Sequence, residues 1–196
     1  MGLGRVIGGA LLVGGAAVIG HAAIRTIDGA EVDRELFGLA NKGHGDTADV
    51  VFGGVTEMGS IVAPLTASGL LAVAGHRRAA ANGAAAACVA WLALQGTKKL
   101  VGRPRPGDAA PETTRMRIAR PQASSWPSSH PAILTTFSRV AARELDVGRS
   151  GRTLLTTLDL AVAYSRVYVG VHYPSDVASG LLIGRAIARW WPRRRR

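Results

Sequence analysis

The chain has 196 residues, a formal net charge of +11, 47% hydrophobic residues and 19% charged residues. This apolar, glycine-rich composition excludes a disordered chain and collagen, and a single cysteine excludes an internal disulfide framework. The length predicts one domain, residues 1–196, and the charge leaves two classes open: a nucleic-acid binder, or a membrane protein whose basic residues lie on one side.

The first predicted element is an uncharged run, residues 6–24, that is long enough to cross a bilayer as a helix. A secretory signal peptide is the alternative, because the small residues Ala22 and Ala23 resemble a cleavage site. We favour a retained span, since the run is long for a signal peptide and further apolar segments follow.

The next segment, residues 26–49, is polar but contains apolar residues at helical spacing. These are Val32, Leu36 and Leu39. Asp28 and Glu31 stand where a capping box would place them. The segment predicts a short helix that lies on the membrane surface.

Five further apolar segments follow along the chain. They cover residues 51–74, 79–95 and 177–191, and two more begin near residues 131 and 154. The sequence therefore predicts an all-α, six-helix transmembrane bundle with a short interfacial helix after the first span. Four prolines between residues 98 and 121 predict a loop in that region.

The distribution of basic residues predicts the orientation of this bundle. The positive-inside rule places both termini in the cytoplasm and residues 98–120 outside it, in a cell (inner) membrane. The cytoplasmic side then carries the whole net charge, with Arg139 and Arg185 snorkelling to reach it. No nucleic-acid partner is needed to explain the charge, and the arginine tail lacks aromatic interleaving beyond Trp190 and Trp191.

Three polar clusters fall on the predicted outer side. The first, residues 98–106, contains Lys98, Lys99, Arg103 and Arg105 within a stretch that glycine and proline make rigid. Cations held in this way favour a phosphate group. A basic patch that touches lipid headgroups is the alternative for this cluster taken alone.

The second cluster, residues 125–130, precedes the fourth predicted span. Pro127 and the serines Ser128 and Ser129 favour a helix start with free N–H groups for an anion, and His130 follows one turn in. An ordinary helix cap explains such a run equally well when it stands alone.

The third cluster contains Arg166, His172 and Asp176. Arg166 ends an apolar helix, where an unpaired charge is costly. Asp176 can accept from one imidazole nitrogen of His172 and leave the other as a lone pair, which is how a basic or nucleophilic histidine is prepared. A His–Asp pair that only joins two helices is the structural alternative.

Together these clusters resemble the type 2 phosphatidic acid phosphatases, which share a site with glucose-6-phosphatase and the vanadium haloperoxidases. The matching motifs, in the family's order, are Lys98 followed after six residues by Arg105-Pro106, then Pro127-Ser128-Ser129-His130, and then Ser165-Arg166 with His172 and Asp176. Ser129 departs from the pattern, because most members have glycine there. The motifs cover residues 98–176.

The resemblance implies a role for each residue. His172 attacks phosphorus, Asp176 orients it, and His130 protonates the leaving oxygen and then activates water. The implied phosphate contacts are Lys98, Arg105, Arg166, Ser128 and Ser129. Arg103 is not part of the family signature, and we expect it to be a secondary phosphate contact. The resemblance implies no metal and no other cofactor, and the remaining acids of the sequence assemble no di-metal carboxylate site.

The resemblance also implies a lipid phosphate as the substrate and the membrane as the environment. A polyprenyl phosphate or diphosphate used in envelope assembly is our preferred interpretation; phosphatidylglycerol phosphate and phosphatidate also fit. Two other hypotheses stay open. One is a vanadate-dependent haloperoxidase, and the other is a non-enzymatic transport or scaffold subunit that uses the intramembrane acids Glu57 and Asp159.

Overall fold

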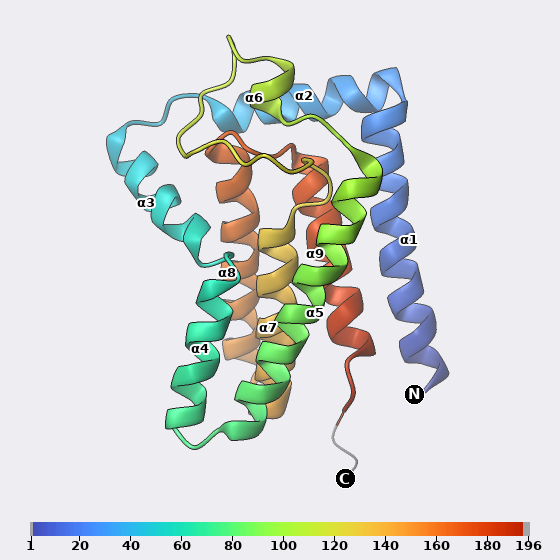
Figure 1. The fold of residues 1–196 in the computed structure, drawn as a ribbon, viewed down its shortest axis with the longest axis vertical. Helices are drawn as coiled ribbons and strands as arrows, with labels where there is room; N and C mark the ends of the chain where they lie inside the picture. The colour runs from blue at the N-terminus through green and yellow to red at the C-terminus, as the bar shows by residue number, and fades with distance from the viewer. Residues whose placement is uncertain (1, 194–196) are drawn as a thin grey trace.

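The computed structural model describes residues 2–193, and within that range the regular structure is nine helices (Figure 1). They are α1 (Leu3–Arg25), α2 (Ile27–Asn41), α3 (Asp46–Glu57), α4 (Val62–Val73), α5 (Arg77–Val101), α6 (Pro106–Ala109), α7 (Ser129–Glu144), α8 (Arg149–Tyr168) and α9 (Pro174–Trp190).

These helices form six upright columns: α1, the α3–α4 pair, α5, α7, α8 and α9 (Figure 1). The short helices α2 and α6 lie across one end of the columns, and both described ends of the chain lie at the other end (Figure 1). The predicted all-α bundle of six columns, with a short helix after the first, is therefore confirmed.

The second column differs from its prediction. We expected one continuous span over residues 51–74, but α3 ends at Glu57, α4 begins at Val62, and the two helices are bent by 63°. Gly59 lies in this break, and a Cβ there would lie 2.8 Å from Cβ of His130 in α7. The chain breaks where its backbone comes too close to α7 for any side chain.

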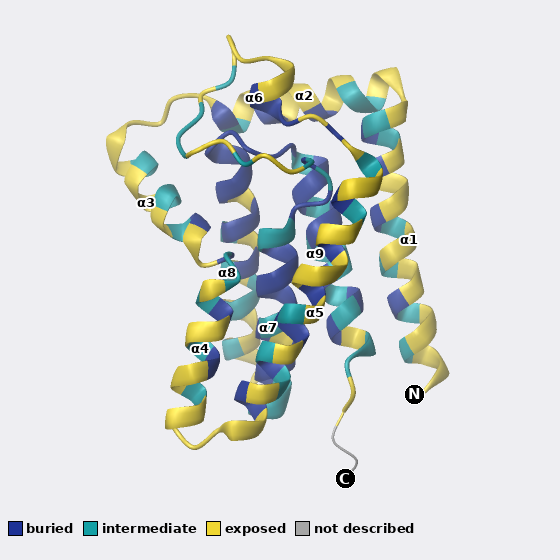
Figure 2. Ribbon diagram, viewed as in Figure 1, coloured by how far each residue is buried: buried dark blue, intermediate teal, exposed yellow. Residues whose placement is uncertain are grey.

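Hydropathy marks fewer spans than the columns suggest. Within residues 2–193, α1 and the stretch Arg77–Ala109 are long and apolar enough to cross a membrane, and the bent α3–α4 pair would make a third. By contrast, α7 and α9 have only 16 and 17 residues, and α8 buries the charged residues Asp159 and Arg166. These three helices form the interior of the bundle, and α1 and α4 expose most of their surface (Figure 2).

The helix α2 forms where it was predicted, but its cap differs. Thr26 is the N-cap, and its Oγ1 accepts a hydrogen bond from the Gly29 N–H at 3.1 Å, so the predicted capping box at Asp28 and Glu31 is wrong. The apolar positions Val32, Leu36 and Leu39 are exposed. The buried positions are Asp33, Phe37 and Asn41, so α2 turns polar groups toward the bundle.

Two glycines allow α7 and α9 to approach closely. A Cβ at Gly180 would lie 2.3 Å from the carbonyl oxygen of Ser128, and a Cβ at Gly184 would lie 2.5 Å from that of Ala132. Thr136 Oγ1 also donates to the carbonyl of Gly184 at 3.2 Å. This contact packs the first turn of α7, which carries residues of the predicted site, against the middle of α9.

We expect Gly184→Ala to destabilise the protein by about 1–3 kcal/mol, because the new methyl group must displace the backbone of α7. Gly96→Ala is the matched control: Gly96 also lies within a helix, has no neighbour within 4 Å of its Cβ position, and its replacement should be neutral or slightly stabilising. The stability of both variants is measured by thermal unfolding of the purified protein in detergent. Equal melting temperatures for the two variants would contradict the close approach.

Candidate functional site

The three predicted clusters come together at the end of the bundle that α2 and α6 cover (Figure 1). Each residue lies at a helix end or in a connection on that side. Lys98 is in the last turn of α5, Arg105 precedes α6, Ser128 and His130 lie at the start of α7, Arg166 is in the last turn of α8, and His172 and Asp176 flank the start of α9.

His172 lies in the turn between α8 and α9, and only 1% of it is exposed. Its Nδ1 is 3.4 Å from Oδ2 of Asp176, and its Nε2 is 3.3 Å from Nη1 of Arg105. Burial lowers the pKa of His172 well below its ordinary value, and the positive charges of Arg105, Arg166 and Lys98 lower it further. The imidazole is therefore neutral near pH 7 and directs one nitrogen toward the cations.

Asp176 is fully buried and accepts several hydrogen bonds. The N–H of Tyr173 donates to Oδ2 at 2.9 Å, the hydroxyl of Ser125 donates to the same oxygen, and Arg103 Nη1 donates to Oδ1 at 2.6 Å. The carboxylate is therefore fixed beside His172 by three donors. Its expected role in orienting the imidazole stays a prediction.

Arg103 lies beside Asp176. Its guanidinium bridges two carboxylates, since Nη2 donates to Asp33 at 2.7 Å and Nη1 donates to Asp176, and it lies 4.2 Å from the centre of the Tyr173 ring. Both Nη atoms of Arg103 are therefore engaged by carboxylates, and its expected role as a secondary phosphate contact stays a prediction.

Asp33 is a residue that sequence reasoning missed. It lies on the buried face of α2, and besides Arg103 it accepts a hydrogen bond from the N–H of Ser175 at 2.9 Å. The signal in the sequence was weak, because α2 contains four acidic residues and only Asp33 among them is buried. Its partners are 70 and 142 residues away along the chain, so spacing alone does not reveal them.

Lys98, Arg105 and Arg166 are buried, and none forms an ion pair within residues 2–193. Arg105 donates to the carbonyls of Ala123 and Val171 at 2.8 and 2.7 Å. Three buried cations without a carboxylate partner favour an anionic ligand.

Two polar atoms in this region lack a partner among the described residues. Nη1 of Arg166 donates to the Thr56 hydroxyl at 2.7 Å, but its buried Nε has no acceptor. The hydroxyl of Ser128 is also buried without a partner, and it sits at the N-cap of α7. The first N–H groups of α7, beginning with Ser129, lie beside it, so a donor set for an anion is present.

His130 is the second residue of α7 and is half-buried. Its Cβ lies against the break at Gly59. The three predicted clusters are thus contributed by α5, α7, α8, α9 and two connections, all at one end of the bundle.

A second polar cluster, also missed by sequence reasoning, fixes the loop above the site. Asn41 donates to the carbonyls of Arg115 and Tyr168 at 3.0 and 2.9 Å, and Arg117 donates to Asp49 and to the Tyr168 carbonyl at 2.6 Å each. These bonds join α2, α3, the loop and the end of α8. They hold the turn that carries His172.

Within residues 2–193, no group of three or more His, Cys, Asp and Glu side chains is arranged to hold a metal ion. The donors that converge at this end of the bundle are mainly cationic or neutral. The arrangement can therefore bind an anion, hold a neutral histidine beside it, and stabilise positive charge on that histidine through Asp176.

Comparison with known proteins gives a family match and two structural neighbours. A sequence model described as the PAP2 superfamily matches residues 78–196. The decaprenylphosphoryl-5-phosphoribose phosphatase of Mycobacterium tuberculosis is 35% identical over 119 residues, which is 61% of this chain and 63% of that protein. The match thus spans less than two thirds of this relative.

The structural neighbours resemble almost the whole bundle. A transmembrane PAP2-type phosphatidylglycerolphosphate phosphatase from Bacillus subtilis has a TM-score of 0.73 at 19% identity, covering 91% of each chain. LpxE from Aquifex aeolicus has a TM-score of 0.71 at 24% identity, covering 79% of this chain and 90% of the other. At these identities the likeness concerns the fold.

Proposed function

The chain belongs to the PAP2 superfamily, and from this premise we propose that it is a membrane-embedded lipid phosphatase. Its substrate is the phosphomonoester or diphosphate of a polyprenyl-type lipid. The observation that carries the proposal is the set of buried cations without carboxylate partners around the neutral, Asp-oriented His172. The relative named as a decaprenylphosphoryl-5-phosphoribose phosphatase supports the polyprenyl class.

In the proposed reaction, Nε2 of His172 attacks phosphorus and the bond from phosphorus to the leaving oxygen breaks. His130 donates a proton to that oxygen, so the lipid leaves as a neutral alcohol, or as the lipid monophosphate when the substrate is a diphosphate. Asp176 stabilises the positive charge on the phosphorylated imidazole. His130 then takes a proton from water, which attacks phosphorus and releases inorganic phosphate and neutral His172.

The cations stabilise charge on the transferred group during both steps. Arg105 lies 3.3 Å from Nε2 of His172, so its guanidinium borders the space that the phosphoryl oxygens would enter. Lys98, Arg166, the Ser128 hydroxyl and the Ser129 N–H complete the proposed contacts. Ser129 supplies the same backbone donor as the usual glycine. No step of this mechanism needs a metal ion or another cofactor.

The two other hypotheses receive less support from the structure. A transport pathway through Asp159 is disfavoured, because this carboxylate accepts hydrogen bonds from Ser138 at 3.1 and 3.3 Å inside the bundle. Glu57 ends α3 and is exposed at the bend. A haloperoxidase would use the same cations to hold vanadate, and a halide-oxidation assay with added vanadate distinguishes it from a phosphatase.

We also propose that the site faces outward from the cytoplasm, with both termini in the cytoplasm. Arg5, Arg77, Arg78 and Arg149 lie near helix ends at the end of the bundle opposite His172 (Figure 1). The positive-inside rule assigns such an end to the cytoplasm. The lipid phosphate would then reach the site from the outer leaflet.

We expect His172→Ala to lower phosphate release from a polyprenyl diphosphate by more than about 10³-fold, because no nucleophile remains. The assay uses the purified protein in detergent with EDTA, and the wild type should stay active there. His76→Ala is the control, since His76 is exposed at the start of α5 on the opposite end of the bundle. Phosphatidate and phosphatidylglycerol phosphate, assayed in parallel, should give a lower kcat/KM.

The two histidines can be separated by trapping the intermediate. With p-nitrophenyl phosphate, whose leaving group needs no acid, His130→Ala should accumulate a phosphoryl group that is stable in alkali and labile in acid, as expected of phosphohistidine. Full activity of His172→Ala would refute the assignment of the nucleophile, and loss of wild-type activity in EDTA would refute metal independence.

Arg103 should act on the rate and not on phosphate binding, because it holds Asp176 and does not face the cation cluster. We expect Arg103→Gln and Asp33→Asn each to lower kcat about 10- to 100-fold with little change in the inhibition constant of inorganic phosphate. Arg105→Gln should weaken phosphate inhibition. Arg120→Gln is the control in the same loop, because Arg120 is exposed and pairs with Asp108 at the surface.

A double variant tests whether Asp33 and Arg103 act as one unit. Asp33→Asn combined with Arg103→Gln should lose no more activity than the worse single variant, since both remove the same support from Asp176. A fall in phosphate affinity equal to that of Arg105→Gln would instead identify Arg103 as a phosphate contact.

The orientation can be tested with single cysteines placed in a Cys88→Ser background. Glu112 is exposed in the loop above the site, and Ser150 is exposed at the start of α8 on the opposite end. A membrane-impermeant maleimide added to spheroplasts should label Glu112→Cys and spare Ser150→Cys until the cells are lysed. The reverse pattern would invert the proposed topology.

A further inference from the structure

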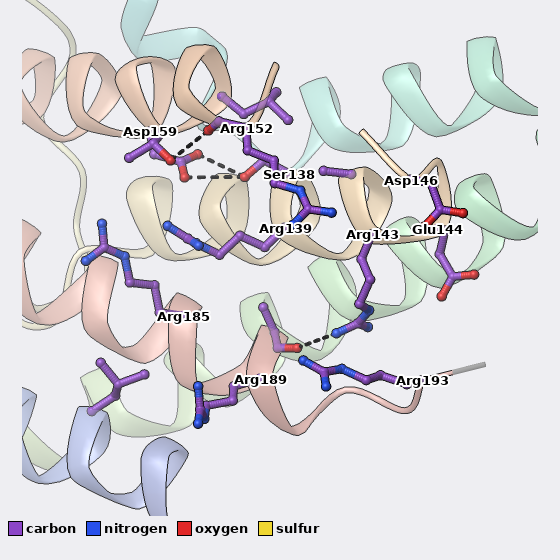
Figure 3. A pocket seen from close by; sticks show the side chains of 15 residues that line it. Ser138, Arg139, Arg143, Glu144, Asp146, Arg152, Asp159, Arg185, Arg189 and Arg193 are labelled. Carbon is purple, nitrogen blue, oxygen red and sulfur yellow. Dashed lines mark hydrogen bonds between the residues drawn. The ribbon is translucent and has the colours of Figure 1, made fainter. Parts of the chain in front are cut away.

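A cavity of about 630 Å³ lies at the end of the bundle opposite His172, between α1, α7, α8 and α9 (Figure 3). It is bordered by the last turns of α7 and α9 and the first turns of α8. The cavity lining contains six arginines and only three acids. The arginines are Arg139, Arg143, Arg152, Arg185, Arg189 and Arg193, and the acids are Glu144, Asp146 and Asp159.

The charges of this cavity are not balanced by local ion pairs. Within residues 2–193, none of the six arginines lies within salt-bridge distance of a carboxylate. Asp159, the most buried acid of the lining, is engaged by Ser138 (Figure 3). The excess positive charge therefore faces a space large enough for more than a bare phosphate ion.

Several guanidinium donors remain available in the cavity. Arg143 donates to the carbonyls of Ala188 and Pro192 at 3.1 and 3.3 Å, but its buried Nε has no acceptor among the described residues. Nε of Arg185 is likewise buried without an acceptor. Arg139 and Arg185, which we expected to snorkel toward the cytoplasm, line this cavity at the end of the bundle that we propose to be cytoplasmic (Figure 3).

The cavity also has an apolar border. Leu12 of α1 and Leu155 of α8 are part of the lining. The neighbouring outward residues Leu11 and Leu154 are 72% and 70% exposed, as lipid-facing side chains would be. A ligand with an anionic head and an apolar chain can therefore place its phosphate among the arginines and its chain along α1 or α8.

We propose that this cavity binds the phosphate group of an anionic lipid from the leaflet at the terminal end of the bundle. The ligand is a bound lipid and not a substrate, because the lining contains no histidine and lies at the opposite end from His172. Arginine fits this task because its fork donates two parallel hydrogen bonds to phosphate oxygens. Inorganic phosphate shares this chemistry, so the test separates the two sources.

The test uses the full chain, purified and delipidated in a neutral detergent. The thermal midpoint is followed during titration with dioctanoyl phosphatidylglycerol, dioctanoyl phosphatidylcholine or inorganic phosphate. Phosphatidylglycerol should raise the midpoint, and phosphatidylcholine should not. Arg139→Gln/Arg185→Gln should require about tenfold more phosphatidylglycerol. The control Arg77→Gln/Arg78→Gln removes two cations at the same end of the bundle but outside the cavity, and should match the wild type.

A second variant keeps the charges and fills the space. Thr156 lines the cavity, so Thr156→Trp should also increase the phosphatidylglycerol concentration that is required, and it decides the outcome if Arg139→Gln/Arg185→Gln does not fold. Equal lipid dependence in the cavity variants and the control would overturn the proposal. A midpoint shift with inorganic phosphate alone, equal to that with phosphatidylglycerol and lost in the cavity variants, would overturn the lipid as the source.

Discussion

Buried positive charge is the constraint on which the site depends. Lys98, Arg105 and Arg166 are each less than 10% exposed, and none has a carboxylate partner among the described residues. Burying such charges costs several kcal/mol unless an anion or fixed dipoles offset them. The protein supplies carbonyl oxygens to Arg105 and a hydroxyl to Arg166, which hold the cations in place without neutralising them. The cost of burying these unneutralised charges favours the binding of a dianionic phosphate.

The one carboxylate inside the site is kept from neutralising these cations. Asp176 is bound by Arg103, Ser125 and the N–H of Tyr173, and Arg103 is bound in turn by Asp33 from α2. The acid is thereby held beside Nδ1 of His172, where the proposed reaction would place positive charge. In that proposed reaction the helix across the end of the bundle supports the site, because its single buried acid holds Arg103, which in turn holds Asp176.

The sequence alone predicted the columns and the residues that meet at the site, because both depend on local pattern. Apolar runs marked the columns, and the motif that contains His172 and Asp176 spans one helix start. Contacts between distant segments were not predicted. The Arg103–Asp33 pair joins residues 70 positions apart, and the break at Gly59 follows from its distance to His130 in another helix. Both the Arg103–Asp33 pair and the break at Gly59 depend on packing between distant segments, and the spacing of residues along the chain does not encode that packing.

Arginines occupy both ends of the interior helices, and the structure uses them in different ways. Near His172 the cations are buried, and carbonyl and hydroxyl oxygens hold Arg105 and Arg166. At the opposite end Arg139 and Arg185 border a wide cavity with leucines at its edge. A rigid site can stabilise a transition state, because its donors need no reorganisation. A wide, apolar-edged site can only retain a ligand, which is why the second cavity is argued as a place for a bound lipid and not for a second reaction.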